Sequence, residues 1–93
     1  MRQYELTAIL GTEEDETSAG KEQIEELLKK GEAKIGKKED FGIRDLAYKI
    51  KKRPKGHYVY FEFEMDPQSA YKMEEELRLA NPLLKYLLIK KEK

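Results

Sequence analysis

Residues 41–63 read FGIRDLAYKIKKRPKGHYVYFEF, and this stretch decides the fold. Two runs rich in aromatic and β-branched residues favour strands. Between them lie Pro54 and Gly56, which predict a turn at that point. The stretch is therefore expected to form a β-hairpin. Its tip would suit a phosphate backbone, because it gathers the basic residues Lys49, Lys51, Lys52, Arg53 and Lys55.

Outward from the hairpin, the chain continues with further strands. The first hairpin strand is expected to begin near residue 34 and to run to about residue 51. Two more strands are expected over residues 2–10 and 84–90, the first with one buried side and the last apolar on both faces. Alternation predicts these buried residues: Tyr4, Leu6, Ala8 and Leu10 in the first strand, and Val59, Phe61, Phe63 and Met65 in the hairpin.

The first predicted helix follows the first strand. An acid-rich run suits a helix N-terminus, and the residues from Thr12 to Asp15 resemble a capping box. Gly31 is expected to end the helix. Helical spacing predicts a buried stripe of Ile24, Leu27 and Leu28.

The second predicted helix follows the hairpin. Asp66 is expected at its N-cap and Pro67 at its first helical position. Asn81 and Pro82 are expected to end it. Its buried stripe is predicted to consist of Ala70, Met73 and Leu77.

The elements run strand, helix, strand, strand, helix, strand, in a single domain over residues 1–93. With right-handed crossovers this order predicts an α+β fold, the ferredoxin-like sandwich, with a four-stranded antiparallel sheet and both helices on one face. The other face is left open, and an exposed apolar face usually has a partner. Tyr58 and Tyr60 point to it. The last strand adds a pair whose parity is ambiguous, either Leu87 and Ile89 or Tyr86 and Leu88.

Length and composition bound the class of protein. Ninety-three residues, 39% of them hydrophobic, suffice for one core. The sequence has no cysteine, so neither a disulfide scaffold nor a thiolate metal site is available. It has no N-terminal apolar signal region and no apolar run of membrane-spanning length. We therefore expect a soluble, cytoplasmic protein.

The formal net charge is zero, but the charges are unevenly distributed. Residues 1–33 hold nine acids against four bases, whereas residues 34–60 hold nine bases against three acids. Residues 61–93 are nearly balanced, with seven acids against six bases. Such a charge dipole would orient the molecule on a nucleic acid.

The sequence offers no set of residues typical of a catalytic site or a metal site. His57 is the only histidine, and no cysteine or serine elbow accompanies it, so no nucleophile–base pair is predicted. His57 is interpreted as a strand-edge residue. The carboxylate clusters match no calcium loop. The expectation is a protein that is not an enzyme, with no metal, no cofactor and no small-molecule substrate.

One alternative use of this fold is an RNA-recognition domain, which stacks bases on the third strand. Residues 55–61 superficially resemble its signature. The stacking positions would fall on His57 and Val59, which share the parity of the buried residues. A docked protein is therefore the favoured use of Tyr58 and Tyr60.

The segment Gly42–Lys51, GIRDLAYKIK, closely resembles the signature of the bacterial small-ribosomal-subunit protein six family. The opening MRQYE is similar to that family's N-terminus, and the similarity continues to the closing strand. The resemblance implies a ferredoxin-like, non-catalytic protein. It implies binding to the central domain of 16S ribosomal RNA as a heterodimer with small-subunit protein eighteen.

The resemblance also implies RNA contacts at Arg2, Tyr4, Arg44 and Lys85, to which the basic tip adds Lys51, Lys52, Arg53 and Lys55. The sequence departs from the family pattern at three positions. Phe41 stands where tryptophan or leucine is common, and Asp45 and Leu84 stand where many relatives have a second basic residue.

Two functional hypotheses follow. The first is a structural, RNA-binding protein of the small ribosomal subunit. The second is a protein-interaction module that uses the open sheet face without RNA. Both require that the basic tip does not fold back on the chain's own acidic helices and that no further element covers the sheet. The predicted partner-binding residues are Tyr58, Tyr60, Leu87 and Ile89.

Overall fold

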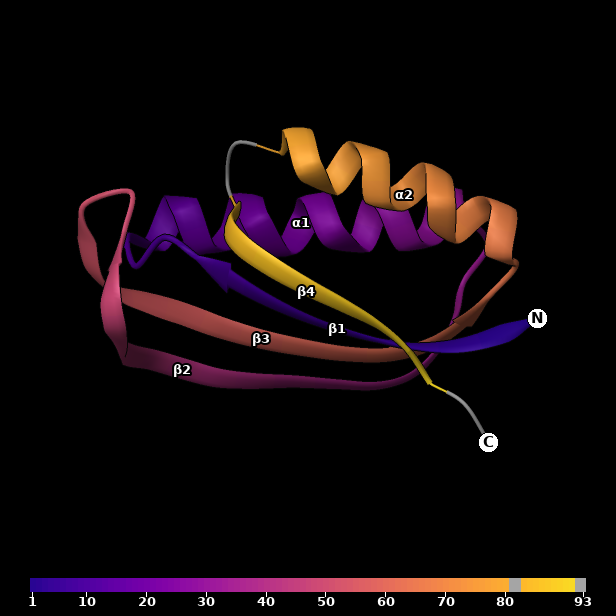
Figure 1. The fold of residues 1–93 in the computed structure, drawn as a ribbon, viewed down its shortest axis with the longest axis horizontal. Coiled ribbons are helices and arrows are strands. Elements are labelled where there is room, and N and C mark those ends of the chain that lie inside the picture. The colour runs from indigo at the N-terminus through magenta and orange to yellow at the C-terminus, as the bar shows by residue number, and fades with distance from the viewer. Residues whose placement is uncertain (81–82, 92–93) are drawn as a thin grey trace.

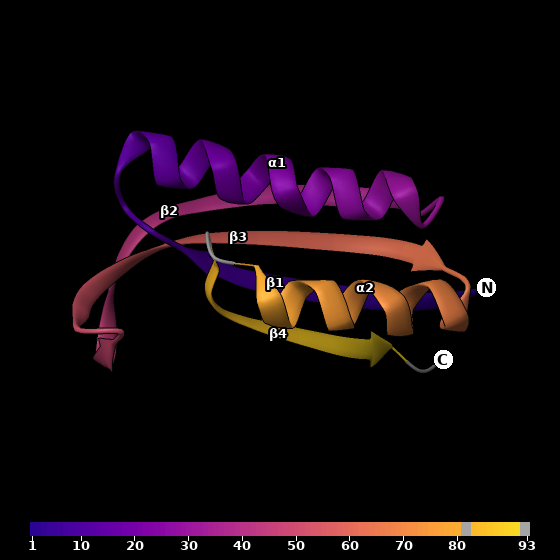
Figure 2. The same cartoon turned by 90° about the horizontal axis from the view of Figure 1, so that it is seen from above.

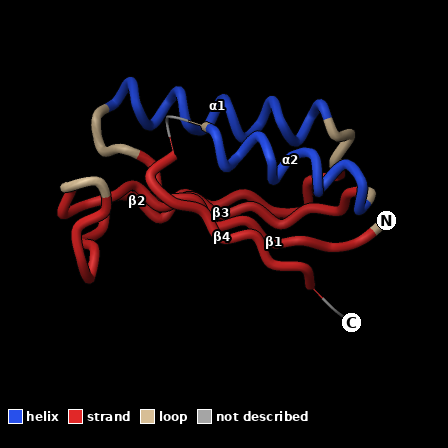
Figure 3. The backbone as a smooth tube through the Cα atoms, turned by 45° about the horizontal axis from the view of Figure 1, so that its top comes forward, coloured by secondary structure: helices blue, strands red, loops and turns tan. Residues whose placement is uncertain are grey.

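The computed structural model describes residues 1–80 and 83–91, which form a sheet with two helices on one face (Figures 1 and 3). The sheet order is β2-β3-β1-β4, and every neighbouring pair is antiparallel. The predicted ferredoxin-like fold is confirmed. Its elements are β1 (Arg2–Leu10), α1 (Glu14–Lys30), β2 (Lys34–Ile50), β3 (Arg53–Met65), α2 (Pro67–Leu79) and β4 (Leu83–Lys91).

The core lies between the helices and the inner face of the sheet. From above, α1 follows the side of the sheet that holds β2 and β3, and α2 follows the side that holds β1 and β4 (Figure 2). The alternating residues predicted for β1 and β3 are buried, as are the predicted stripes of both helices. Burying each large aliphatic side chain stabilises the fold by about 1.5–3 kcal/mol. Within the described residues, no helix is long and apolar enough to cross a membrane.

Helix α1 begins one residue later than its predicted capping box implies. The N-cap is Glu13, and the capping box joins Glu13 to Glu16 instead of Thr12 to Asp15. The carboxylate three positions into the helix is the one that reaches back to the N-cap backbone. The Glu13 N–H donates to Glu16 Oε1 at 3.3 Å. At the other end Gly31 is the C-cap, as predicted.

Helix α2 begins as predicted, with Asp66 at the N-cap and Pro67 in the first turn, although the Asp66 side chain makes no capping hydrogen bond. The helix ends at Leu79. The predicted stop residues, Asn81 and Pro82, lie outside the described residues.

The hairpin turn differs from the prediction. Lys51 and Lys52 form it, and Ile50 pairs with Arg53 across it. Both lysines have positive φ, 50° and 66°, as a two-residue hairpin loop of the I′ type requires. Pro54 and Gly56, the predicted turn residues, lie inside β3. Gly56 serves close packing instead, because a Cβ there would collide with the Ile9 side chain.

The ambiguous parity of β4 is resolved by its pairing with β1. Leu88 lies opposite Leu6 and packs against the core, whereas Leu87 lies opposite Thr7 on the open face. Leu87 and Ile89 are 57% and 45% exposed. They therefore share the open face with Tyr58 and Tyr60.

Strand β2 is an edge of the sheet and is irregular. Its register against β3 shifts between Ile35 and Lys37 and again between Asp40 and Gly42. Gly42 has a φ of 78°, which a glycine adopts without steric cost. The second irregularity brings Phe41 to the open face, where its ring lies 6.1 Å from that of Tyr60.

Candidate nucleic-acid interface

The basic hairpin tip, residues 44–55, curls at one end of the sheet (Figures 1 and 3). Lys51 Nζ donates to the Leu83 carbonyl at 3.4 Å, and Lys85 Nζ donates to the Tyr48 hydroxyl at 3.2 Å. In the sheet, β1 and β3 lie between β2 and β4. The hairpin tip must therefore extend across the width of the sheet to make these contacts with β4. Lys85, distant in sequence, thereby joins the lysines of the turn.

The predicted RNA-binding residues form two groups at opposite ends of the sheet. Arg2 lies opposite Met65, and eight positions along β1 Leu10 lies opposite His57. At about 3.3 Å per residue that separation is roughly 26 Å. Arg2 and Tyr4 occupy the end away from the hairpin tip. The structure gathers the others near the tip: Arg44, Lys51, Lys52, Arg53, Lys55 and Lys85.

Tyr4 belongs to the core. It is 7% exposed, and its ring stacks on Phe63 with centroids 5.7 Å apart. Burial raises the pKa of the Tyr4 hydroxyl. Any RNA contact at this position would therefore be limited to the edge of the side chain.

Arg53 is held by the chain's own acidic helix start. Its Nη1 donates to Glu16 Oε1 at 2.7 Å and its Nη2 donates to Glu16 Oε2 at 2.6 Å. Bidentate arginine–carboxylate salt bridges of this geometry are among the stronger hydrogen-bonded pairs in proteins. These hydrogen bonds lower the pKa of the Glu16 carboxyl. The expectation that the whole basic tip stays clear of the acidic helices is wrong for this residue. A phosphate contact by Arg53 stays a prediction and would compete with Glu16.

The other tip residues are more open. Lys51 and Lys52 are both exposed residues of the turn, although Lys51 Nζ also contacts the Leu83 carbonyl. Lys55 Nζ lies 3.9 Å from Asp45, an ion pair between two well-exposed side chains that holds neither firmly. Solvated cations of this kind are available to phosphates.

Arg44 connects the tip to the open face. Its guanidinium carbon lies 5.8 Å from the centroid of the Phe41 ring, and its Nε donates to the Phe41 carbonyl at 3.4 Å. Phe41 in turn contacts Tyr60. Sequence reasoning treated Phe41 only as a departure from the family pattern. Its position before a glycine in a strand was the available signal, because such a glycine often marks a bulge.

The centre of the open face is acidic. The Tyr60 hydroxyl lies 2.7 Å from Glu5 Oε2 and 2.8 Å from Glu62 Oε2, and these hydrogen bonds raise the pKa of Tyr60. Glu5 and Glu62 are directly opposite in the ladder, a like-charge pair. The Tyr60 hydroxyl proton can be donated to only one of the two carboxylates at a time. Lys91 also approaches both, with its Nζ 3.7 Å from Glu5 Oε2 and 4.0 Å from Glu62 Oε1. Sequence reasoning missed both glutamates, since neither motif nor turn marks them.

The interpretation of His57 as a strand-edge residue is wrong, because His57 lies within β3 and pairs with Leu10 of β1 and with Ile43 of β2. Its role is nevertheless structural. Its Nε2 lies 2.6 Å from Asp40 Oδ1, and Lys21 Nζ lies 2.5 Å from Asp40 Oδ2. The Gly42 N–H also donates to Asp40. The lysine, first among these partners, lowers the pKa of Asp40 to about 2. One carboxylate thus joins α1, β2 and β3.

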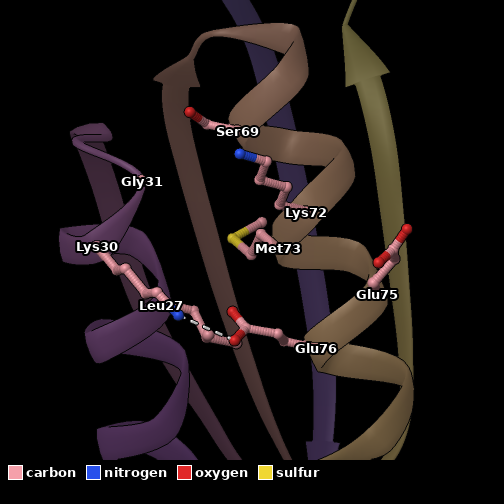
Figure 4. A pocket seen from close by; sticks show the side chains of 8 residues that line it. All are labelled: Leu27, Lys30, Gly31, Ser69, Lys72, Met73, Glu75 and Glu76. Carbon is pink, nitrogen blue, oxygen red and sulfur yellow. Dashed lines mark hydrogen bonds and ion pairs between the residues drawn. The ribbon is translucent and has the colours of Figure 1, made fainter.

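A groove of about 420 Å³ lies between α1 and α2, on the helical side of the molecule (Figure 4). The Lys30–Glu76 ion pair spans it, with Nζ and Oε1 3.1 Å apart. Lysines and glutamates mix along its walls, and none of the predicted interface residues lines it. Its charges neutralise one another, so it offers no surface of one sign to a polyanion.

Comparison with known proteins matches residues 3–90 to the family model described as ribosomal protein S6. The chain is 38% identical over 92 residues to small ribosomal subunit protein bS6 of Treponema denticola, covering 99% of each chain. It is 30% identical to bS6 of Thermus thermophilus, covering 97% of this chain and 91% of that one. The crystal structure of 30S ribosomal protein S6 from Thermotoga maritima superposes with a TM-score of 0.87 at 27% identity, covering 97% of this chain and 87% of that one.

Proposed function

The chain belongs to the ribosomal protein S6 family, and from this premise we propose that it binds the central domain of 16S rRNA together with small-subunit protein eighteen. Family membership makes it a small-subunit ribosomal protein that works in the cytoplasm and is not an enzyme. The proposal concerns how such a protein engages its RNA and its partner.

Support for the RNA surface comes above all from the reach of the hairpin tip to β4. The contacts of Lys51 with Leu83 and of Lys85 with Tyr48 gather the exposed cations at one end of the molecule. Arg44 extends this surface along the open face. Arg2 lies at the end of β1 away from the hairpin tip, so we propose that it contacts the RNA separately from the other cations. The surface acts by charge and shape, since backbone phosphates carry no base identity.

Support for the protein surface comes from the remainder of the open face. Tyr60 and Ile89 lie near its acidic centre, and Tyr58 and Leu87 lie toward the hairpin tip. Both helices lie on the opposite face (Figures 1 and 3). Among residues 1–80 and 83–91, the hairpin tip lies against the part of the open face near Ile9, Tyr58 and Leu87. Two carboxylates in its middle suit a partner that brings apolar side chains and a basic group.

Titration of a central-domain 16S rRNA fragment with this protein and protein eighteen, at several salt concentrations, tests the proposal. Neutralising four to six phosphates would give log affinity against log salt a slope of roughly −3 to −5. Replacing Lys85 by methionine is expected to make the slope less steep by about one phosphate contact. A slope near zero for the native protein would contradict RNA binding through this surface.

A further inference from the structure

The curl of the hairpin tip encloses a hollow of about 270 Å³ against the open face of the sheet. One wall comes from the tip, with Leu46 and Tyr48, and the other from the sheet, with Ile9 and Tyr58. Lys85 stands at its margin. The hollow thus combines apolar walls, two aromatic rings and a cation.

The Tyr48 ring keeps its face open. Lys85 Nζ lies 3.2 Å from the Tyr48 hydroxyl oxygen but 5.7 Å from the ring centroid. Because the hydroxyl projects from the ring edge, these two distances place the ammonium beyond the hydroxyl and not over the ring. A cation that engages the π-system would lie over the face. Tyr48 is 65% exposed, so its ring surface is accessible to a ligand.

The charge around the hollow is predominantly positive, since Asp45 is the one acid of the tip and pairs with Lys55. No acidic side chain lines it among the described residues, and Lys85 is the only charged residue that does. The tip that forms its outer wall also carries exposed lysines at residues 49, 51, 52 and 55. The acidic pair of the open face, Glu5 and Glu62, lies outside this lining. An anionic ligand is therefore favoured here, in contrast to the centre of the sheet.

We propose that this hollow is a nucleotide subsite that takes one unpaired base of single-stranded RNA, with the base against Tyr48 and Tyr58 and its phosphate beside Lys85. The inference rests on the proposed RNA binding and adds a defined subsite to it. Aromatic side chains stack unpaired bases of any sequence, and lysines neutralise the adjoining phosphates. An apolar side chain of a partner protein would match the walls but not the lysines that surround them.

The test measures binding of a short single-stranded RNA of mixed sequence, by fluorescence anisotropy at fixed salt, to the full chain and its variants. Tyr48→Leu is expected to weaken binding about tenfold through loss of stacking. Tyr48→Phe keeps the ring but loses the hydroxyl that Lys85 contacts, so it is expected to weaken binding clearly less than Tyr48→Leu does. Tyr71→Leu is the matched control, because Tyr71 is equally exposed at 66% but lies on α2. Circular dichroism confirms that each variant is folded.

The outcomes separate the subsite from RNA binding itself. Selective loss in Tyr48→Leu, with an unchanged salt slope, supports the subsite, because stacking involves no phosphate charge. Equal affinities of Tyr48→Leu and Tyr71→Leu would overturn the subsite while native RNA binding stands. The subsite is also overturned if Tyr48→Leu loses only binding to purified protein eighteen. If the native chain shows no salt-dependent RNA binding even in the presence of protein eighteen, the proposed function fails with it.

Discussion

At the scale of single residues, the two turn lysines have an uncommon backbone. Lys51 and Lys52 both adopt left-handed conformations, where asparagine and glycine are the ordinary residues of such a turn. A left-handed residue with a Cβ costs roughly 1–2 kcal/mol. Strain of this kind tends to persist at functional positions, and here it lets Lys51 reach back to the Leu83 carbonyl while Lys52 stays exposed at the turn.

Lys52→Gly is expected to raise the free energy of unfolding by about 0.5–1 kcal/mol, because glycine relieves the positive φ but loses more entropy on folding. The same change should weaken RNA binding by removing one cation. Urea unfolding and RNA titration measure the two effects. Lys52→Ala serves as the control, since it removes the charge but keeps the strain. A Lys52→Gly variant no more stable than Lys52→Ala would contradict the strain argument.

At the scale of elements, Asp40 fixes the arrangement of two strands and a helix. It accepts from Lys21 of α1, lies against His57 of β3 and accepts the Gly42 N–H within β2. Its pKa is lowered to about 2 from an ordinary value of 3.8. The charged carboxylate therefore stabilises the folded state above pH 3.8, and this contribution is lost as the pH falls toward 2.

Asp40→Asn is expected to lower the free energy of unfolding at pH 7 by about 1 kcal/mol, a figure reduced for solvent screening because the side chain is 41% exposed. The difference from the native protein should shrink as the pH is lowered from 4 toward 2. Urea unfolding at both limits measures it. Asp45→Asn, at a carboxylate that is 85% exposed, should change little at either pH. A pH-independent loss in Asp40→Asn would show that packing and not charge is responsible.

Sequence periodicity predicted the elements well because each buried face repeats every two or about four residues. It failed at the hairpin turn, since Gly56 is needed for the approach of Ile9 and not for reversal of the chain. It could not decide which residues of β4 face the core, because a strand with apolar residues on both faces shows no alternation. The basic tip was readable from composition. The Tyr60 cluster was not, because Glu5 and Tyr60 meet across 55 positions of sequence through strand pairing.

At the scale of the whole molecule, opposite charges are separated along the open face. The extents are 36 × 24 × 19 Å, so ligands can occupy the hairpin end and the centre of the sheet side by side. Cations gather at the hairpin tip, and Glu5 and Glu62 occupy the sheet centre. The two ligands proposed for this protein therefore meet neighbouring surfaces, and these surfaces share Tyr58 and Leu87 at the hollow beneath the hairpin tip.

Tyr60→Ala is expected to weaken binding to protein eighteen by tenfold or more, as loss of a central aromatic anchor does, and to leave RNA binding by the hairpin end nearly unchanged. Arg44→Ala should weaken RNA binding by a few-fold. Titration of each variant with the RNA fragment and with protein eighteen separately measures both. Tyr71→Ala is the control. If Arg44→Ala leaves RNA affinity intact while Tyr60→Ala abolishes partner binding, the interaction-module hypothesis is favoured.

The clamp between Arg53 and Glu16 has a kinetic consequence. Because the Arg53 guanidinium is bound to Glu16 in the first turn of α1, the hairpin tip adopts its curved shape when the polypeptide folds. The hairpin tip therefore loses little conformational entropy when it binds RNA. A surface that is preorganised in this way associates without a slow ordering step. Assembly should accordingly be limited by how quickly the nucleic acid arranges itself around a rigid template.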